Sequence, residues 1–245
     1  MKPIINYLFL LLFATTATAQ YDSKGEKEIS RFRPGTFWFF TGTRPAKLDK
    51  VRKYDRLIFD ITYNDWKGDL KPFQVKPTSI GFGTNLLFDV PLTIGNTISL
   101  GWGLNYQRIH VQHNNTFFTN LKDGWTQYAI SPVTGKASFN YNQFSIPLEI
   151  RFRKESWKHF KLHVGGKIGY ITNGYQKNIL DDGSGRTVIK DYHFPDINKL
   201  QYSAHLRFGV RNYALFGEYN FSQLFSNAAS TQLNIFRLGL SISLF

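Results

Sequence analysis

The sequence predicts an all-β protein, a transmembrane antiparallel up-and-down β-barrel of about eight strands. Three observations predict it. Apolar and polar residues alternate with a period of two from Leu57 onward, the connections between these segments alternate between long and short, and the chain opens with a short apolar leader. Membrane strands show this alternation over roughly ten residues, because lipid-facing and lumen-facing side chains alternate.

The leader predicts export. Lys2 precedes an apolar run from Ile4 to Phe13, and small residues follow as far as Ala19. This pattern is typical of a cleaved signal peptide, and the run is too short to cross ~30 Å of hydrocarbon as a helix. We therefore expect a signal peptide at residues 1–19, an N-terminal periplasmic segment at 20–56 and one barrel domain at 57–245.

Composition excludes several classes of function. The chain has no cysteine, so a lipid-modified cysteine, disulfides and thiolate chemistry are excluded. A net charge of +13 with 13 Tyr, 23 Phe and 5 Trp could suggest a nucleic-acid binder with stacking aromatics. The leader argues against that class, since exported proteins rarely meet nucleic acid, and we expect no nucleic-acid partner.

The predicted strands follow one another in chain order, each with an apolar face. In the first four segments these faces carry Phe59, Ile61 and Tyr63; Ile80, Phe82, Leu86, Phe88 and Val90; Ile98, Leu100, Trp102, Leu104 and Tyr106; and Phe144, Ile146, Leu148, Ile150 and Phe152. In the fifth, sixth and eighth they carry Phe160, Leu162, Val164, Ile168 and Tyr170; Leu200, Tyr202, Ala204, Leu206, Phe208 and Val210; and Phe236, Leu238, Leu240, Ile242 and Leu244. The seventh, Tyr213 to Phe221, is less regular because Phe216 shares a face with Glu218 and Asn220.

A soluble β-sandwich or lectin-like domain is the alternative fold. Its outward face would meet water and carry more Lys, Glu and Thr than Gly. Here the polar faces are rich in glycine, such as Gly101, Gly103 and Gly239, which favours the tight interior of a narrow barrel. Closure also satisfies the backbone hydrogen bonds that lipid cannot.

The connections predict the orientation of the barrel. Long or polar connections are expected at Lys67–Pro77, Val111–Tyr141, Thr172–Lys199 and Gln223–Gln232, and short ones at Pro91–Thr97, Lys154–His159 and Arg211-Asn212. Outer-membrane barrels place long loops outside and short turns in the periplasm. Aromatic residues should form interfacial girdles, with Tyr63, Trp66, Tyr106, Tyr170, Tyr202 and Tyr219 at the outer rim and Trp157, Phe160, Tyr213 and Phe245 at the inner rim.

The last nine residues resemble the β-signal that the barrel-assembly machinery reads. Arg237, Gly239, Ile242, Leu244 and the terminal Phe245 match its pattern. In size and shape, the chain from Leu57 to Phe245 is similar to the PorT-type small outer-membrane barrels. That resemblance implies location in the outer membrane of a Gram-negative bacterium, and some relatives are implied in type IX protein secretion.

The predicted interior is ionised. An eight-stranded barrel is just wide enough for its own side chains to fill, so an open diffusion pore is not expected. We expect a lumen ion network formed by Asp60, Asp89, Glu149, Glu218, Arg151, Arg153, Lys161, Lys167, Arg207, Arg211, Arg237, His163 and His205. Structural pairing is its first interpretation, because buried charges need partners; an acid–base site is the second.

Other candidate sites are weaker. A lipid-modifying barrel needs Ser, His and a carboxylate together near the outer leaflet, and spacing shows no such set near His110 and His113. Those two histidines are a weak metal pair, and Asp181–Gly185 is better interpreted as a turn than as a calcium loop. No cofactor is expected. A basic run carries Arg44, Lys47, Lys50, Arg52, Lys53 and Arg56, which predicts a solvated linker or a periplasmic patch for anionic partners.

We therefore expect a non-enzymatic outer-membrane barrel that acts as an accessory or interaction component, in secretion or envelope assembly. A lipid-modifying enzyme and a narrow channel are the alternatives. Expected partners are outer-membrane lipids, the barrel-assembly machinery during biogenesis and proteins of a secretion or envelope complex.

Overall fold

The computed structural model describes residues 55–68, 74–93, 97–130, 136–153, 160–181, 185–210 and 212–244. The chain divides into two units, Met1–Lys50 and Val51–Phe245, and every described residue belongs to the second. The expected signal peptide lies outside the described residues, as does all but the last two residues of the expected N-terminal segment. None of the described residues forms a helix long and apolar enough to cross a membrane.

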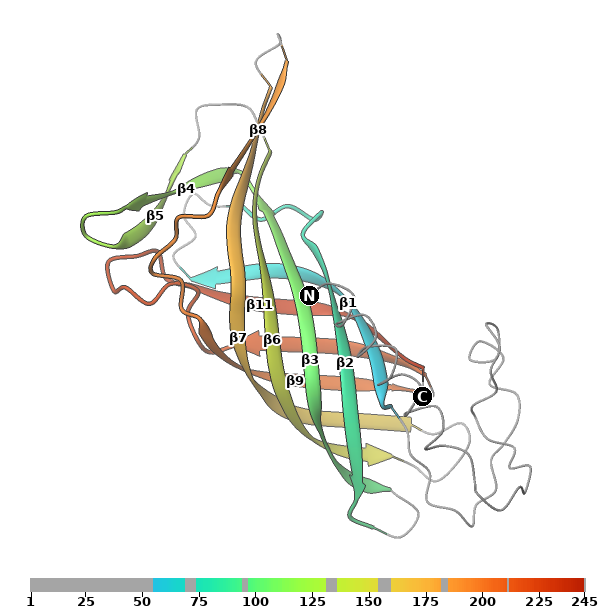
Figure 1. Ribbon diagram of the computed structural model, residues 1–245. Coiled ribbons are helices and arrows are strands. Elements are labelled where there is room, and N and C mark those ends of the chain that lie inside the picture. The colour runs from blue at the N-terminus through green and yellow to red at the C-terminus, as the bar shows by residue number, and fades with distance from the viewer. Residues whose placement is uncertain are drawn as a thin grey trace, which may run out of the picture. The chain divides into compact units, whose positions relative to one another are not determined.

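Eight antiparallel strands form the wall of a closed barrel (Figure 1). They are β1 (Leu57–Gly68), β2 (Ile80–Pro91), β3 (Ile98–His113), β6 (Lys136–Arg153), β7 (Phe160–Asp181), β9 (Leu200–Val210), β10 (Tyr213–Asn220) and β11 (Leu233–Ser243). Each pairs with its neighbour in the chain, and β1 closes the barrel on β11, from Ile58 opposite Ser243 to Gly68 opposite Leu233. The predicted fold class and strand number are confirmed.

The pleat separates a lipid face from a lumen face. On β11 the Leu240 side chain is 57% exposed, whereas its neighbour Ser241 is 1% exposed. On β1, Ile61 stands opposite Leu240 and is exposed, whereas Asp60 stands opposite Ser241 and is buried. Exposed apolar side chains on one face are the expected solution for strands whose solvent is lipid.

One bulge changes which residues of β7 face outward. Asn142 of β6 pairs with Asn173, while the next residue, Gln143, pairs with Ile171. Thr172 is therefore an extra residue in β7, and an extra residue exchanges the two faces of a strand. Beyond the bulge, Gln176 is buried and Lys177 is turned to the outside.

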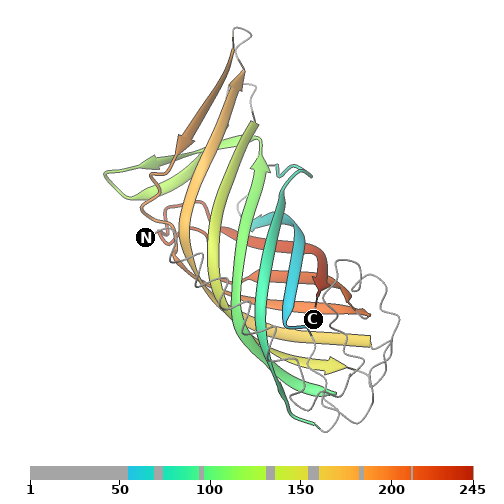
Figure 2. The ribbon, with the colours of Figure 1, turned by 45° about the vertical axis from the view of Figure 1, so that its right-hand side comes forward.

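Strands β6 and β7 continue past the barrel where long polar connections are predicted. There β7 pairs with a further strand, β8 (Arg186–Asp191), and a separate hairpin forms from β4 (Asn115–Asn120) and β5 (Trp125–Ile130). Figures 1 and 2 show β6, β7 and β8 extending beyond the other strands as a ribbon. The connections thus carry regular structure that the expectation of polar loops missed. We call this the long-loop end and the opposite one the short-turn end.

Candidate functional site

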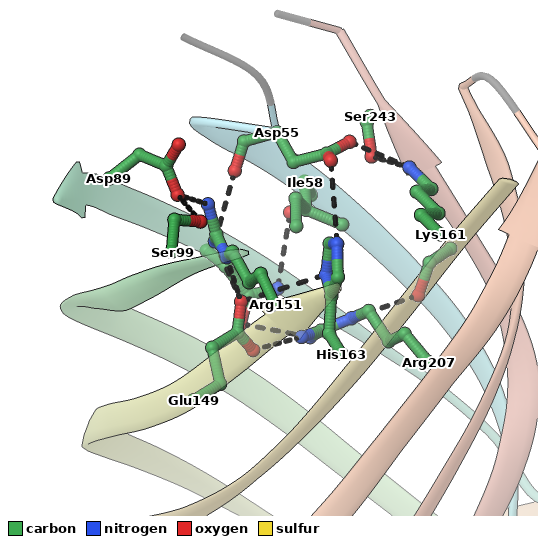
Figure 3. A network of polar contacts seen from close by, with 12 residues as sticks. Asp55, Ile58, Asp89, Ser99, Glu149, Arg151, Lys161, His163, Arg207 and Ser243 are labelled. Atoms are coloured by element: carbon green, nitrogen blue, oxygen red, sulfur yellow. Dashed lines mark hydrogen bonds and ion pairs between the residues drawn. The ribbon is translucent and has the colours of Figure 1, made fainter. Parts of the chain in front are cut away.

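Glu149 of β6 lies at the centre of an ion network in the lumen (Figure 3). Arg151 Nη2 lies 2.6 Å from Glu149 Oε1, and His205 Nε2 lies 2.8 Å from Glu149 Oε2. Arg207 donates to Glu149 at 2.9 Å and to Asp60 at 3.0 Å. All five side chains are at most 3% exposed. Direct pairing with opposite charges offsets the desolvation free energy that burying each charge alone would cost.

The network continues toward the short-turn end through Asp89. Arg151 donates to Asp89 Oδ1 at 3.0 Å and Arg153 donates to Asp89 Oδ2 at 3.1 Å. The Ser99 hydroxyl donates to the same carboxylate at 2.7 Å. One carboxylate therefore ties β2, β3 and β6 together inside the barrel.

Asp55 precedes the first strand and closes this end of the network. Its carboxylate accepts from Lys161 Nζ at 2.6 Å, and its carbonyl accepts from Arg151 at 3.2 Å. Its φ of 55° is left-handed, a conformation uncommon for a non-glycine residue. Burial alone would raise the pKa of Asp55, but Lys161, His163, Arg153 and Arg151 hold that pKa well below its usual range. The expected solvated linker is wrong at this residue, which is 3% exposed.

A second cluster lies around Glu218 of β10. Lys167 donates to it at 2.6 Å and Ser203 at 3.1 Å, and Arg237 pairs with its other side. Phe216 explains the irregular seventh strand, because it faces the lumen at 2% exposure. Lys167, Arg207 and Arg237 lie over its ring at 5.1, 5.0 and 5.7 Å from the centroid, within the range of cation–π attraction.

The two-residue turn at Arg211-Asn212 predicts that His205 stands opposite Glu218. The register confirms this pairing, beginning from Val210 opposite Tyr213. Directly opposite residues are close enough for a carboxylate to accept a hydrogen bond from an imidazole, which predicts such a bond here, but each side chain bonds elsewhere. His205 reaches across the lumen to Glu149, and Glu218 is held by Lys167 and Arg237. Register fixes which residues are opposite, and the three-dimensional lumen decides which atoms meet.

The lumen changes from polar to apolar at the long-loop end. We call the buried cluster there the apolar plug: Trp66, Ile109, Val111, Phe117, Phe139, Tyr141, Ile171, Phe194, Leu224, Phe225, Leu233 and Ile235. Phe139 is fully buried and its ring lies 5.7 Å from that of Phe117 on the β4–β5 hairpin. The plug is not among the features predicted from the sequence. The sequence pattern that indicates it is that Ile109 and Val111 lie on the same face of β3 as the lumen-facing Gln107.

Trp66 corrects the predicted outer girdle. Its side chain is 1% exposed and packs on His113 and Phe117, so it belongs to the plug. It has the same parity as Asp60, Thr62 and Asn64, which places it in the lumen. Tyr63, Tyr170 and Tyr202 do face outward at 37–52% exposure.

A buried carboxylate fastens the hairpin over the plug. Asp196 accepts from the Thr126 hydroxyl of β5 at 2.6 Å and from the Ser230 hydroxyl at 2.5 Å. The Thr126 backbone N–H also bonds the Ser230 hydroxyl at 2.9 Å. Three connections at the long-loop end are therefore joined at one point, and the hairpin is held as a cover.

Nine residues of the thirteen expected in the lumen network face the barrel interior in these two clusters and beside them, and all nine are buried. They are Asp60, Glu149, Arg151, His163, Lys167, His205, Arg207, Glu218 and Arg237. Asp89, Arg153 and Lys161 join them, and Arg211 lies outside the described residues. Asp55 is the addition that sequence reasoning missed. An alternating pattern begins at the first strand and contains no signal for a residue that precedes it.

The other candidate residues are dispersed. His110 faces outward, with its Nδ1 2.6 Å from the Asn140 side-chain oxygen, whereas His113 is buried in the plug on the opposite face of β3. They form no pair. Of the basic run, only Arg56 is described, half-buried beside the barrel end; Arg44, Lys47, Lys50, Arg52 and Lys53 lie outside the described residues.

The predicted assembly signal lies on β11 and just after it. A Cβ on Gly239 would lie 2.0 Å from the Ile61 carbonyl oxygen, so only glycine fits this closing seam. Arg237 and Ile242 lie in β11, Leu244 follows it, and Phe245 lies outside the described residues.

The closed lipid-faced wall and its paired lumen charges define an integral outer-membrane β-barrel. A family model described as "Outer membrane protein beta-barrel domain" matches residues 58–229, and the chain belongs to that family. No curated protein matches the sequence significantly.

Two solved structures show a limited likeness. Both are of Ail, the attachment invasion locus protein of Yersinia pestis, and the second holds the heparin analogue sucrose octasulfate. They share 15% and 14% identity with this chain at TM-scores of 0.34 and 0.32. Each match covers 76% of this chain and 95% of the Ail chain. The barrel assignment itself rests on the strand register and the family match.

Proposed function

We propose that this protein is a non-enzymatic outer-membrane component that acts through its exposed surfaces as an accessory or interaction protein. A secretion complex of the type IX kind, or envelope assembly, is the proposed setting, as the PorT-type resemblance implies. One observation carries the proposal. The described lumen is occupied by paired ions along its length and covered by the apolar plug at its outer end.

The filled interior weighs against the two alternatives. A narrow channel needs a continuous polar path, and fully buried rings such as Phe139 and Phe225 stand across its outer end. A lipid-modifying enzyme needs its acid–base groups open to the outer leaflet. The carboxylate–histidine contact between Glu149 and His205 is buried in the lumen instead.

The β4–β5 hairpin offers a surface suited to a protein partner. It presents Phe118 of β4 and Leu121 of the turn, which are 42% and 70% exposed, and Phe118 packs edge-on against Trp125 at 5.6 Å. Exposed aromatic and aliphatic side chains on a fastened support are typical of interaction anchors. The Asp196 contacts hold this hairpin in place.

Site-specific crosslinking in the native membrane tests the proposal. A photoreactive side chain at position 121 should give discrete protein adducts, which mass spectrometry identifies. The matched control carries the same group at position 240, on the lipid face, and should give lipid adducts. Ion conductance of the purified barrel in planar bilayers, or turnover of outer-leaflet lipid in place of protein adducts, would contradict the proposal.

A further inference from the structure

One strongly basic surface has no part in the lumen or the plug. We call it the outer ribbon face; it consists of Lys136, Tyr175, Lys177, Lys190 and Tyr192. The Thr172 bulge turns Tyr175 and Lys177 outward. Lys177 stands opposite Lys190 on β8 and opposite Ser138 on β6. Lys136 lies two residues before Ser138 on β6 and therefore on the same face. Three lysines from three adjacent strands therefore share one face.

Two of these lysines face each other across the ribbon. Like charges directly opposite on a sheet are destabilising, and the Lys177 and Lys190 pair is of this kind. None of the three lysines forms an ion pair with a carboxylate among the described side chains. Lys190 Nζ lies instead 5.9 Å from the centre of the Tyr175 ring, which itself packs on Tyr192 at 5.1 Å. An external anion would relieve the repulsion.

The position of this face indicates where the anion comes from. The outward side of the same strands carries the exposed rim aromatics Phe144 and Tyr170, and Arg108 is exposed just beyond Tyr106. Lys177 follows Tyr170 by seven residues, about 16–19 Å farther along the membrane normal for a strand tilted by ~35–45°. The lysines thus face sideways, above the lipid that surrounds the barrel.

We propose that the outer ribbon face binds phosphate groups in the headgroup sugars of the outer-leaflet glycolipid. Lys136, Lys177 and Lys190 pair with the phosphates as compact point charges. The Tyr175 and Tyr192 rings supply an apolar surface beside them. This site would order lipid around the ribbon, and it is independent of the proposed interaction role, which rests on the β4–β5 hairpin.

Nanodiscs that contain phosphatidylcholine with either a full-length glycolipid whose headgroup sugars are phosphorylated or its dephosphorylated form provide the test. Native mass spectrometry after detergent extraction counts the glycolipid retained by the barrel. The wild type should retain the phosphorylated form preferentially. Each lysine near an anionic surface contributes on the order of fivefold, so a variant with Lys136→Gln, Lys177→Gln and Lys190→Gln should bind it about 100-fold more weakly.

The control variant is Lys122→Gln, an exposed lysine on the β4–β5 turn, which should retain glycolipid as the wild type does. The mobility shift on heating in detergent gels verifies that each variant is folded. Equal retention by wild type and triple variant, or no preference of the wild type for the phosphorylated form, would overturn the proposal. A triple variant that retains the glycolipid but no longer crosslinks to an acidic protein would also overturn the proposal, because that result would assign the face to a protein partner.

Discussion

Asp55 Oδ1 accepts a hydrogen bond from Lys161 Nζ at 2.6 Å, which joins the residue before the first strand to the start of β7. The same Lys161 donates to the Ser243 hydroxyl of β11 at 2.7 Å. The chain just before β1, the start of β7 and the end of β11 thus meet at one ammonium group (Figure 3). This contact makes the charge balance of the lumen depend on a residue outside the strands.

Asp55→Asn should destabilise the barrel by about 3–5 kcal/mol, because it leaves a buried ammonium without its carboxylate. The urea concentration at which the heat-modifiable gel band is lost measures this. A double variant with Asp55→Asn and Lys161→Met should recover part of the loss, since both partners are then removed. No recovery would mean that Asp55 acts through its backbone conformation and not through this pair.

The same pair predicts a pH dependence. The pKa of Asp55 is lower in the folded barrel than its usual value near 3.8. Its stabilisation is therefore complete above about pH 4–5 and is lost as the pH falls toward the folded pKa. The stability difference between wild type and Asp55→Asn should be constant from pH 5 to 8 and shrink below about pH 4. A difference that grew on acidification would contradict the ion pair.

Leu240→Arg should impair assembly, at a cost of about 2–4 kcal/mol for a charge near the bilayer midplane. Ser241→Ala should cost about 1 kcal/mol, because Asp60 loses one hydroxyl donor and keeps Arg207 and Asn85. Recovery of folded protein from outer-membrane fractions compares the two. If Ser241→Ala were the more damaging change, the register assigned to β11 would be wrong by one residue.

Glu218→Gln should lower stability by about 3 kcal/mol or more while the protein stays in the outer membrane. The carboxylate faces two cations, Lys167 and Arg237, and its loss leaves both buried without it. This is a larger effect than the pairing with His205 predicts by itself. Denaturant titration of the purified barrel measures the loss of stability. As the control, His205→Gln should perturb the Glu149 cluster and cost less stability than Glu218→Gln.

Phe139→Ala should destabilise by about 3–5 kcal/mol, because the plug around it cannot collapse fully into the cavity. Phe144→Ala, on the same strand, is the control. Its side chain is 55% exposed to lipid and leaves no enclosed cavity. Equal losses in the two variants, measured by the same gel shift, would mean that the plug contributes no more than the lipid face.

The strands and the lumen residues could be predicted because a strand in lipid must alternate. Glu149, Arg207 and Glu218 were placed correctly by parity alone, and the turn length was enough to pair His205 with Glu218. Trp66 was misplaced because an aromatic residue near a strand end is typical both of a girdle and of a plug. Parity decides between them, and it favours the lumen.

The sequence by itself determined the closed barrel, its eight strands and the ionic character of its interior, since all three follow from a period of two and from turn lengths. The tertiary structure alone decided that Asp55 enters the lumen and that His205 bonds Glu149 instead of its cross-strand neighbour. It also decided that the Thr172 bulge sends Lys177 outward. These depend on distances across the lumen and on one extra residue in a ladder, which local patterning along the chain does not encode.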